Sequence, residues 1–153
     1  MAGTEFRVST ASNLTLNSGT ENAISIGAHA SIGFLVYRVS VEFQSLGDET
    51  GKAFIEIVRS DAHTNVGGDA DKISLSGDSD DPSMTCRHFP GGLSNEVAIA
   101  HKYWPITTTS PCIFDFGGLT RLKVNGGKVL AVKVTGPAGA ATTQYNVTID
   151  GTE

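Results

Sequence analysis

Long apolar runs, basic clusters and an export signal are all missing from this sequence. No window approaches the 18 or more consecutive apolar residues of a membrane-spanning helix, and the first residues lack an apolar stretch behind a basic start. We therefore expect no membrane partner. The protein is expected to be made in, and to stay in, a cytoplasm-like compartment until it assembles with something else.

Charge is scarce and mainly negative. The 153 residues include 11 Lys and Arg against 16 Asp and Glu, a formal net charge of −5, and only 18% of the chain is charged. Nowhere do Lys and Arg form the basic run that binding to a phosphate backbone needs, so nucleic acid is not an expected partner.

Cysteine is also scarce. Cys86 and Cys112 are the only two, which is too few for the disulfide framework of a small secreted domain. Two free and mostly buried thiols are the favoured interpretation. A single disulfide between them is the alternative.

Signatures of catalysis are not found in the chain. The sequence has no Gly-x-Ser-x-Gly elbow, no His-Glu-x-x-His zinc motif and no Gly-rich phosphate loop, and its four histidines are scattered. Cys86 and His88 stand two residues apart but lack the second nearby pair that a zinc site requires. We expect neither an enzyme nor a bound cofactor.

What the sequence does contain is alternation of apolar and polar residues with a period of two, the pattern of half-buried strands. The longest example runs from Ile32 to Phe43 and is expected to be buried on both faces at its start and on one at its end, because its other face passes from Phe34 and Val36 to Arg38, Ser40 and Glu42. The face expected to point inward carries Leu35, Tyr37, Val39, Val41 and Phe43. Further strands are expected at Glu5 to Val8, Ala23 to Ile26, Lys52 to Ser60, Ile73 to Leu75, Thr85 to Phe89, Val97 to Tyr103, Cys112 to Phe116, Thr120 to Val124, Lys128 to Val134 and Gln144 to Ile149.

Turn residues separate these segments. Asn125-Gly126-Gly127 predicts a tight type I′ hairpin turn between the strands on either side, because Asn and Gly tolerate positive φ. An Ala-rich helical turn remains an alternative for Val97 to Tyr103. Many short strands with many turns predict an all-β fold, an antiparallel β-sandwich of jelly-roll-like type with about 8 to 10 strands.

The N-terminal part of the chain is polar. We divide the chain into residues 1–22, an N-terminal arm or edge segment rich in Ser, Thr and Asn, and residues 23–153, the sandwich domain. An arm of this composition cannot bury enough apolar surface to become ordered alone, so it is expected to pair with a neighbouring molecule. Asn13, Leu14 and Leu16 are its candidate interface residues.

Tyr103 and Trp104 form a second candidate interface, beside the Thr-rich turn from Ile106 to Ser110. Trp104 is the only tryptophan, and a lone Trp at a strand end is usually a packing or subunit-contact anchor. The alternative is a platform on which a sugar ring stacks, as in carbohydrate-binding sandwiches.

Residues 61–81 are rich in Gly, Asp and Ser and are expected to form a long solvated loop around a short strand. Their carboxylates alternate in the way that calcium prefers, although the EF-hand order of ligands is absent. The weak candidate ligands are Asp69, Asp71, Asp78 and Asp80.

Both ends of the chain resemble a family of small β-sandwich virion proteins of tailed bacteriophages. At the start, Phe6 to Ser9 and Ser12 to Leu16 precede the long strand Phe34 to Phe43; at the end, Lys128 to Ala138 precedes a final strand, Tyr145 to Ile149, like that family's closing hairpin. The two ends cover about a third of the chain. The two cysteines and the acidic loop depart from the pattern.

The resemblance implies a jelly-roll-like subunit of a phage particle, made in the host cytoplasm. A head decoration or cement protein, a homotrimer bound to the major capsid protein or another virion protein, is the leading expectation. Such proteins have no catalytic residues to transfer to this chain. The alternative is a carbohydrate-binding module, for example in a tail fibre or receptor-binding component.

Overall fold

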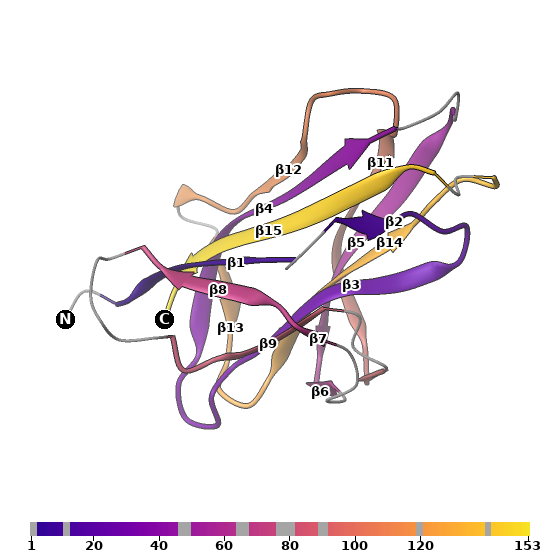
Figure 1. Cartoon of the computed structure of the whole chain (residues 1–153). Helices are drawn as coiled ribbons and strands as arrows, with labels where there is room; N and C mark the ends of the chain where they lie inside the picture. The colour runs from indigo at the N-terminus through magenta and orange to yellow at the C-terminus, as the bar shows by residue number, and fades with distance from the viewer. Residues whose placement is uncertain are drawn as a thin grey trace.

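The computed structural model describes residues 3–10, 13–45, 50–63, 68–75, 82–88, 92–118, 121–139 and 142–153. Within these ranges the chain forms strands and turns only, arranged as two antiparallel sheets that face each other (Figure 1). A helix long and apolar enough to cross a membrane does not occur in this part of the chain.

One sheet, sheet A, has seven strands and the other, sheet B, has six. Sheet A contains β1 (Glu5–Ser9), β2 (Leu14–Thr15), β4 (Phe34–Gln44), β8 (Asp71–Ser74), β12 (Cys112–Asp115), β13 (Leu122–Val124) and β15 (Gln144–Thr152). Sheet B contains β3 (Thr20–Gly27), β5 (Lys52–Ser60), β7 (Gly68–Asp69), β9 (Thr85–His88), β11 (Val97–Pro105) and β14 (Val129–Thr135). The strands β6 (Ala62–His63) and β10 (Leu93–Ser94) pair with each other in a separate two-stranded ribbon.

Eight of the strands pair in a nested series: β1 with β15, β3 with β14, β4 with β12, and β5 with β11. This is the pairing of one long antiparallel ribbon folded over on itself, with the strand orders β1-β15-β4-β12 and β3-β14-β5-β11 in the two sheets. It is the jelly-roll arrangement. The predicted all-β antiparallel sandwich is confirmed, and the described residues hold more strands than the expected 8 to 10 because several have only two residues.

The core between the sheets is built from the inward side chains that the alternation pattern predicted. In β15, buried and half-buried residues alternate along the whole strand. Phe6 of β1 and Phe34 of β4 meet edge to face with ring centroids 5.8 Å apart, and Ile55 and Leu130 of sheet B are fully buried. Each such side chain contributes about 1.5–3 kcal/mol to folding.

The strand β4 changes its buried face part-way along. Val36 and Arg38 pair with consecutive residues of β15, so Tyr37 is an extra residue in β4. A β-bulge of this kind reverses the alternation beyond it. Phe34 and Val36 are buried as expected at the start of the strand, whereas the prediction that Leu35 and Tyr37 face inward is wrong, since both are only half-buried. The buried residues on the two sides of the bulge are Phe34, Val36, Val39, Val41 and Phe43.

The turn at Asn125 is present, but it is not the expected hairpin. The Lys128 N–H donates to the Asn125 carbonyl at 3.1 Å, and the positive φ of 73° falls on Gly127, not on Asn125 or Gly126. The predicted type I′ turn is therefore wrong, because a single positive φ at the third of the four turn residues is typical of a type II turn. β13 pairs with β4 in sheet A, whereas β14 pairs with β3 and β5, so the turn carries the chain from one sheet to the other.

The closing segment also passes between the sheets. β14 belongs to sheet B, and β15 lies in the middle of sheet A between β4 and β1. The expected closing hairpin of these two strands is therefore wrong. Jelly-roll topology explains the difference, because its consecutive strands cross from sheet to sheet while its paired strands lie far apart in sequence.

Between β5 and β11, the described parts of residues 61–96 add strands to both sheets, and β6 folds back over sheet B. In this segment β8 extends sheet A beside β1, and β9 extends sheet B beside β3. His63 of β6 lies over β3, on the face opposite Ile24 and Ile26. Under this cover the outward-facing Ser25 is fully buried.

Candidate functional site

An aromatic cluster lies on the outer face of sheet B. Phe54 of β5 is directly opposite Tyr103 of β11, with ring centroids 4.9 Å apart and planes tilted by 39°. The ring of His101 is 5.5 Å from that of Phe54. Tyr103 is 65% exposed. Since the neighbouring Ile55 points into the core, these three rings face solvent.

Exposed apolar side chains gather at the same side of the sandwich. Of the five large hydrophobic residues exposed in the described parts of the chain, Val97 and Tyr103 are on β11 and Ile113 is on β12; the others are Ile32 and Leu75. β11 and β12 are outermost in their sheets. We take the exposed or half-buried side chains of Phe54, Val97, His101, Tyr103 and Ile113 as a candidate contact surface, which we call the β11 surface.

The open edge of β11 carries three features that oppose strand addition. Ile99 is an extra residue in the pairing with β5, which makes a bulge. Lys102 points toward the sandwich, where its ammonium donates to the Ile113 carbonyl and lies 4.9 Å from the centre of the Phe114 ring. Pro105 ends the strand. Bulges, inward charges and prolines protect sheet edges from pairing with other chains, so side chains and not backbone offer the contact here.

Trp104 serves local packing. Its indole N–H donates to the Ser110 carbonyl at 3.0 Å, and the ring packs against the core. This bond holds the turn that follows β11, where Ile106 is fully buried. Of the two aromatic residues expected to form an interface, only Tyr103 is exposed, while Trp104 has its polar atom already bonded.

Of the N-terminal candidate interface residues, too, some are buried and one is exposed. Leu14 and Leu16 are 3% and 0% exposed and belong to the core, because β2 pairs with β15. Asn13 is exposed and lines a shallow hollow beside Gln44 and Gln144. The described residues of the segment 1–22 thus pack on the sandwich, with β1 inside sheet A and β2 at an edge.

Of the four candidate calcium ligands, two lie on described strands. Asp69 lies on β7 in sheet B and Asp71, which is exposed, on β8 in sheet A. Asp78 and Asp80 lie outside the described residues. Across the described ranges, no group of three or more His, Cys, Asp or Glu side chains is placed to hold a metal ion.

Cys86 and Cys112 are both buried and unbonded, as the sequence favoured. Cys86 is on β9 of sheet B and Cys112 on β12 of sheet A. Burial raises the pKa of Cys86 to about 12 and raises that of Cys112 as well. Thiols in such surroundings are poor nucleophiles.

A serine and a histidine form a covered polar pair under the β6–β10 ribbon. The Ser25 hydroxyl is 2.6 Å from Nδ1 of His63. Burial lowers the pKa of His63, and the positive charge of Arg87 lowers it further. Ser25 is fully buried, so the pair fixes the ribbon on the sheet instead of presenting a nucleophile to solvent.

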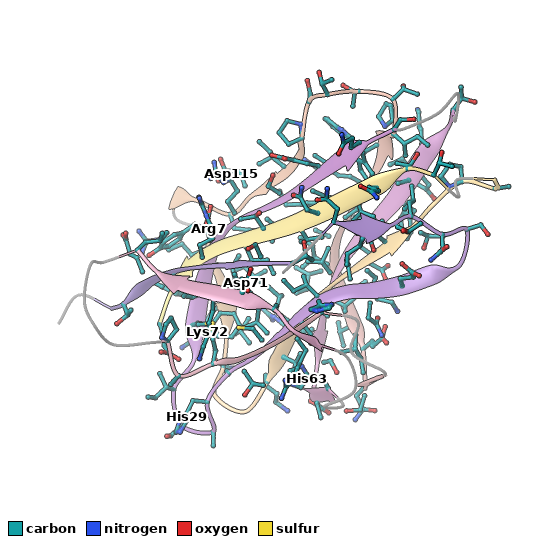
Figure 2. All side chains as sticks on the ribbon, viewed as in Figure 1. Arg7, His29, His63, Asp71, Lys72 and Asp115 are labelled. Atoms are coloured by element: carbon teal, nitrogen blue, oxygen red, sulfur yellow. The ribbon has the colours of Figure 1, made fainter. Side chains whose placement is uncertain are left out.

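The outer face of sheet A is polar and internally paired. Arg7 contacts both carboxylate oxygens of Asp150 at 2.7 and 3.2 Å, and Arg38 adds a third bond at 2.9 Å. Burial opposes ionisation of Asp150, but the bonds and charges of the two arginines outweigh it and lower the pKa. Figure 2 shows Arg7 on this face.

The second candidate site is a basic groove of about 260 Å³ at the end of the sandwich where β5 and β13 approach each other. Arg59, Lys123 and Lys128 line it, together with Asp61 and Asn95. One N–H of Arg59 donates to the Lys123 carbonyl at 2.9 Å. Sequence reasoning missed this groove because its cations are single residues far apart in the chain, with Arg59 and Lys123 separated by 64 positions.

Asp61 is the one acid in the groove. Its carboxylate accepts bonds from Lys128 at 2.6 Å and from Asn95 at 2.8 Å. These two bonds, with that of Lys128 the stronger, lower the pKa of Asp61. The pair is exposed, so water and salt screen it, and it contributes little to stability. Counting side chains, three positive and one negative charge leave the groove at +2.

Comparison with known proteins finds no match for this chain, neither among protein-family models nor among curated proteins.

Proposed function

We propose that this chain is a structural protein of a bacteriophage particle, a capsid decoration or cement protein. It binds the outer capsid surface as a homotrimer and stabilises it, with the major capsid protein or another virion protein as its partner. The observation that carries the proposal is the β11 surface, an exposed aromatic and aliphatic surface on a jelly-roll domain whose other outer face is polar and internally paired.

The chemistry of the β11 surface suits contact with protein. Tyr103 and Phe54 offer rigid aromatic area at a small cost in side-chain entropy, and such residues dominate the binding energy of protein interfaces. The protected edge of β11 keeps copies from adding strands to one another without limit. Binding through many symmetric copies then supplies avidity that a small single contact lacks.

The test is co-sedimentation of the purified chain with particles that lack it. We expect the wild-type chain to bind and Tyr103→Ser to bind about tenfold or more weakly, because loss of an aromatic anchor at an interface costs about 2 kcal/mol or more. Ile32→Ser, which removes an exposed apolar residue elsewhere, is the matched control and should bind normally. Equal binding by wild type and Tyr103→Ser would count against the proposal.

A carbohydrate-binding module is the second candidate. The observation in its favour is the exposed ring of Tyr103 beside the polar side chains of His101 and Glu56, which face each other across β11 and β5. Two results together would replace the capsid proposal with this one. The wild-type chain would fail to bind particles but be retained on a glycan array, and Tyr103→Ser would abolish that retention.

A further inference from the structure

The basic groove combines an excess of positive charge with one fixed hydrogen-bond acceptor. Arg59, Lys123 and Lys128 are three of the 11 basic residues in a chain of net charge −5. The acid in the lining, Asp61, is paired with Lys128. A ligand that suits the groove therefore brings negative charge to Arg59 and Lys123 and hydrogen-bond donors to Asp61.

The cations of the groove have donors to spare. Within the described residues, Lys123 has no bonded partner for its ammonium, and Arg59 uses one of the five N–H donors of its guanidinium, on the Lys123 carbonyl. A guanidinium and an ammonium that line one groove can bind the same carboxylate through charge-assisted hydrogen bonds. Asn95 and Asn125 add neutral amide groups to the lining.

Asp61 has acceptor capacity left over. One of its carboxylate oxygens accepts from Lys128 and the other from Asn95, and a carboxylate has room for about four hydrogen bonds. Those two bonds also lower its pKa, so Asp61 is ionised at neutral pH and can only accept. A ligand that carries nothing but negative charge is repelled by Asp61, whereas a ligand that also carries hydroxyl groups can donate to it.

The backbone holds Asp61 and Asn95 in place before any ligand binds. The buried hydroxyl of Ser60 is 2.7 Å from the Ser94 carbonyl and accepts the Ser94 N–H at 3.0 Å, and the Asp61 N–H donates to the same carbonyl at 2.9 Å. Within the described ranges, Asn95 is the one residue other than glycine with a positive φ, 52°. Residues held in such a conformation concentrate at ligand sites, and a site fixed in advance costs less entropy to occupy.

We propose that the basic groove binds an acidic sugar, a sugar unit that carries a carboxylate. Arg59 and Lys123 bind the carboxylate of the sugar, and Asp61 accepts hydrogen bonds from its hydroxyl groups. The amides of Asn95 and Asn125 can donate to the same hydroxyls or accept from them. The site is independent of the capsid proposal, and it does not use the ring of Tyr103.

Titration of the isotope-labelled full chain, followed by NMR chemical shifts in low-salt buffer, tests this site. The probes are three acidic sugars, D-galacturonate, D-glucuronate and N-acetylneuraminate, with neutral D-galactose and inorganic phosphate in parallel. We expect at least one acidic sugar to bind saturably, to shift the side-chain amide signals of Asn95 and Asn125, and to bind about tenfold or more tightly than galactose. Lys123→Gln, which removes no bond of the described residues, should weaken that binding about tenfold, because it removes one charge-assisted hydrogen bond.

A second variant separates sugar binding from general attraction of anions. Asp61→Ala should strengthen the binding of phosphate, because it removes a repelling charge, and should remove the acceptor of the sugar hydroxyls. The preference for the acidic sugar over phosphate should therefore fall about tenfold or more. Lys52→Gln, at the far end of β5 about 23 Å from Arg59, and Tyr103→Ser, about 20 Å along β11 from Val97 of the lining, are the controls and should bind the sugar as wild type does. Circular dichroism of each variant confirms that the fold is kept.

Three results would overturn the acidic-sugar site. The first is that none of the three acidic sugars binds saturably. The second is that phosphate or a glutamate-rich peptide binds as tightly as the best acidic sugar, because the groove would then be a general anion site. The third is that Lys123→Gln and Asp61→Ala leave the sugar binding and its preference over phosphate unchanged. Binding of particles is measured separately, so a chain with an empty groove can still bind particles, and a chain that binds the sugar can still fail to bind them.

Discussion

Folding changes the pKa of His63, a residue that titrates in the pH range of ordinary buffers. Its imidazole bonds to the buried hydroxyl of Ser25, and Arg87 is near. Burial and that positive charge lower the pKa of His63 in the folded protein, while in the unfolded chain it titrates near its usual value of about 6.5. Below that pH the unfolded chain binds a proton that the folded chain resists, so folding loses free energy.

We therefore predict that the free energy of unfolding falls as the pH drops below about 6.5. The loss should be smaller in His63→Asn, which keeps a polar group next to Ser25 without a proton to gain. Urea unfolding at several pH values measures both. His29→Asn, at an exposed histidine, is the control, and a pH dependence identical in all three proteins would contradict the assignment to His63. The lowered pKa values of Asp61 and Asp150 act at lower pH, below about 4, so their effect is separate.

Gly127 is required by the turn that links the two sheets. Its φ of 73° lies in the left-handed region, where a residue with a Cβ costs about 1–2 kcal/mol. We predict that Gly127→Val lowers the free energy of unfolding by about that amount or more, because a β-branched residue is the most strained there. Thermal or urea melting measures it. Gly19→Val, at an exposed site with no atom near its Cβ position and no positive φ, should change stability by a few tenths of a kcal/mol. Equal effects at both glycines would mean that strain is not the cause.

At the scale of elements, bulges decide which way the strands face. Tyr37 is the extra residue in β4, Ile99 in β11, and Ala23 in β3 where it pairs with β14. Each bulge shifts the phase of the alternation, and in β4 apolar residues on both sides of the bulge reach the core. This phase shift explains why both faces of the segment Ile32 to Phe43 carry apolar residues at its start.

The edge strand β11 carries a prediction of its own. Replacing the inward Lys102 by Val should raise self-association, because an inward charge on an edge strand hinders pairing with another chain. Light scattering against protein concentration measures the rise. Lys102→Arg keeps the charge and should behave as wild type. A Lys102→Val protein that stays as dispersed as wild type would show that the Ile99 bulge and Pro105 protect the edge by themselves.

For the whole molecule, the two sheets have different outer faces. The outer face of sheet A holds the Arg7, Asp150 and Arg38 network, and that of sheet B holds the aromatic cluster. The basic groove lies toward β5 and β13, at one end of the sandwich. A molecule with such different sides offers a different kind of contact on each of them.

The candidate site was only partly predictable from the sequence. Tyr103 was expected at an interface and is exposed, but Leu14 and Leu16 were assigned to an arm and are in the core. Both leucines follow a polar stretch, and their burial depends on β2 reaching β15 at the other end of the chain. The residues near Leu14 and Leu16 in the sequence do not indicate that β2 pairs with β15.

The sequence by itself determined which residues form strands and that the strands make a sandwich. Alternation between inside and outside is a property of neighbouring residues, so it can be read along the chain, as at Lys52 to Ser60. Only the tertiary structure decided which strands pair, why the Asn125 turn crosses between sheets, and that Arg59 and Lys123 share a groove. Those outcomes depend on contacts between distant segments, and the entropy of closing a long loop rises too slowly with its length to favour one partner over another.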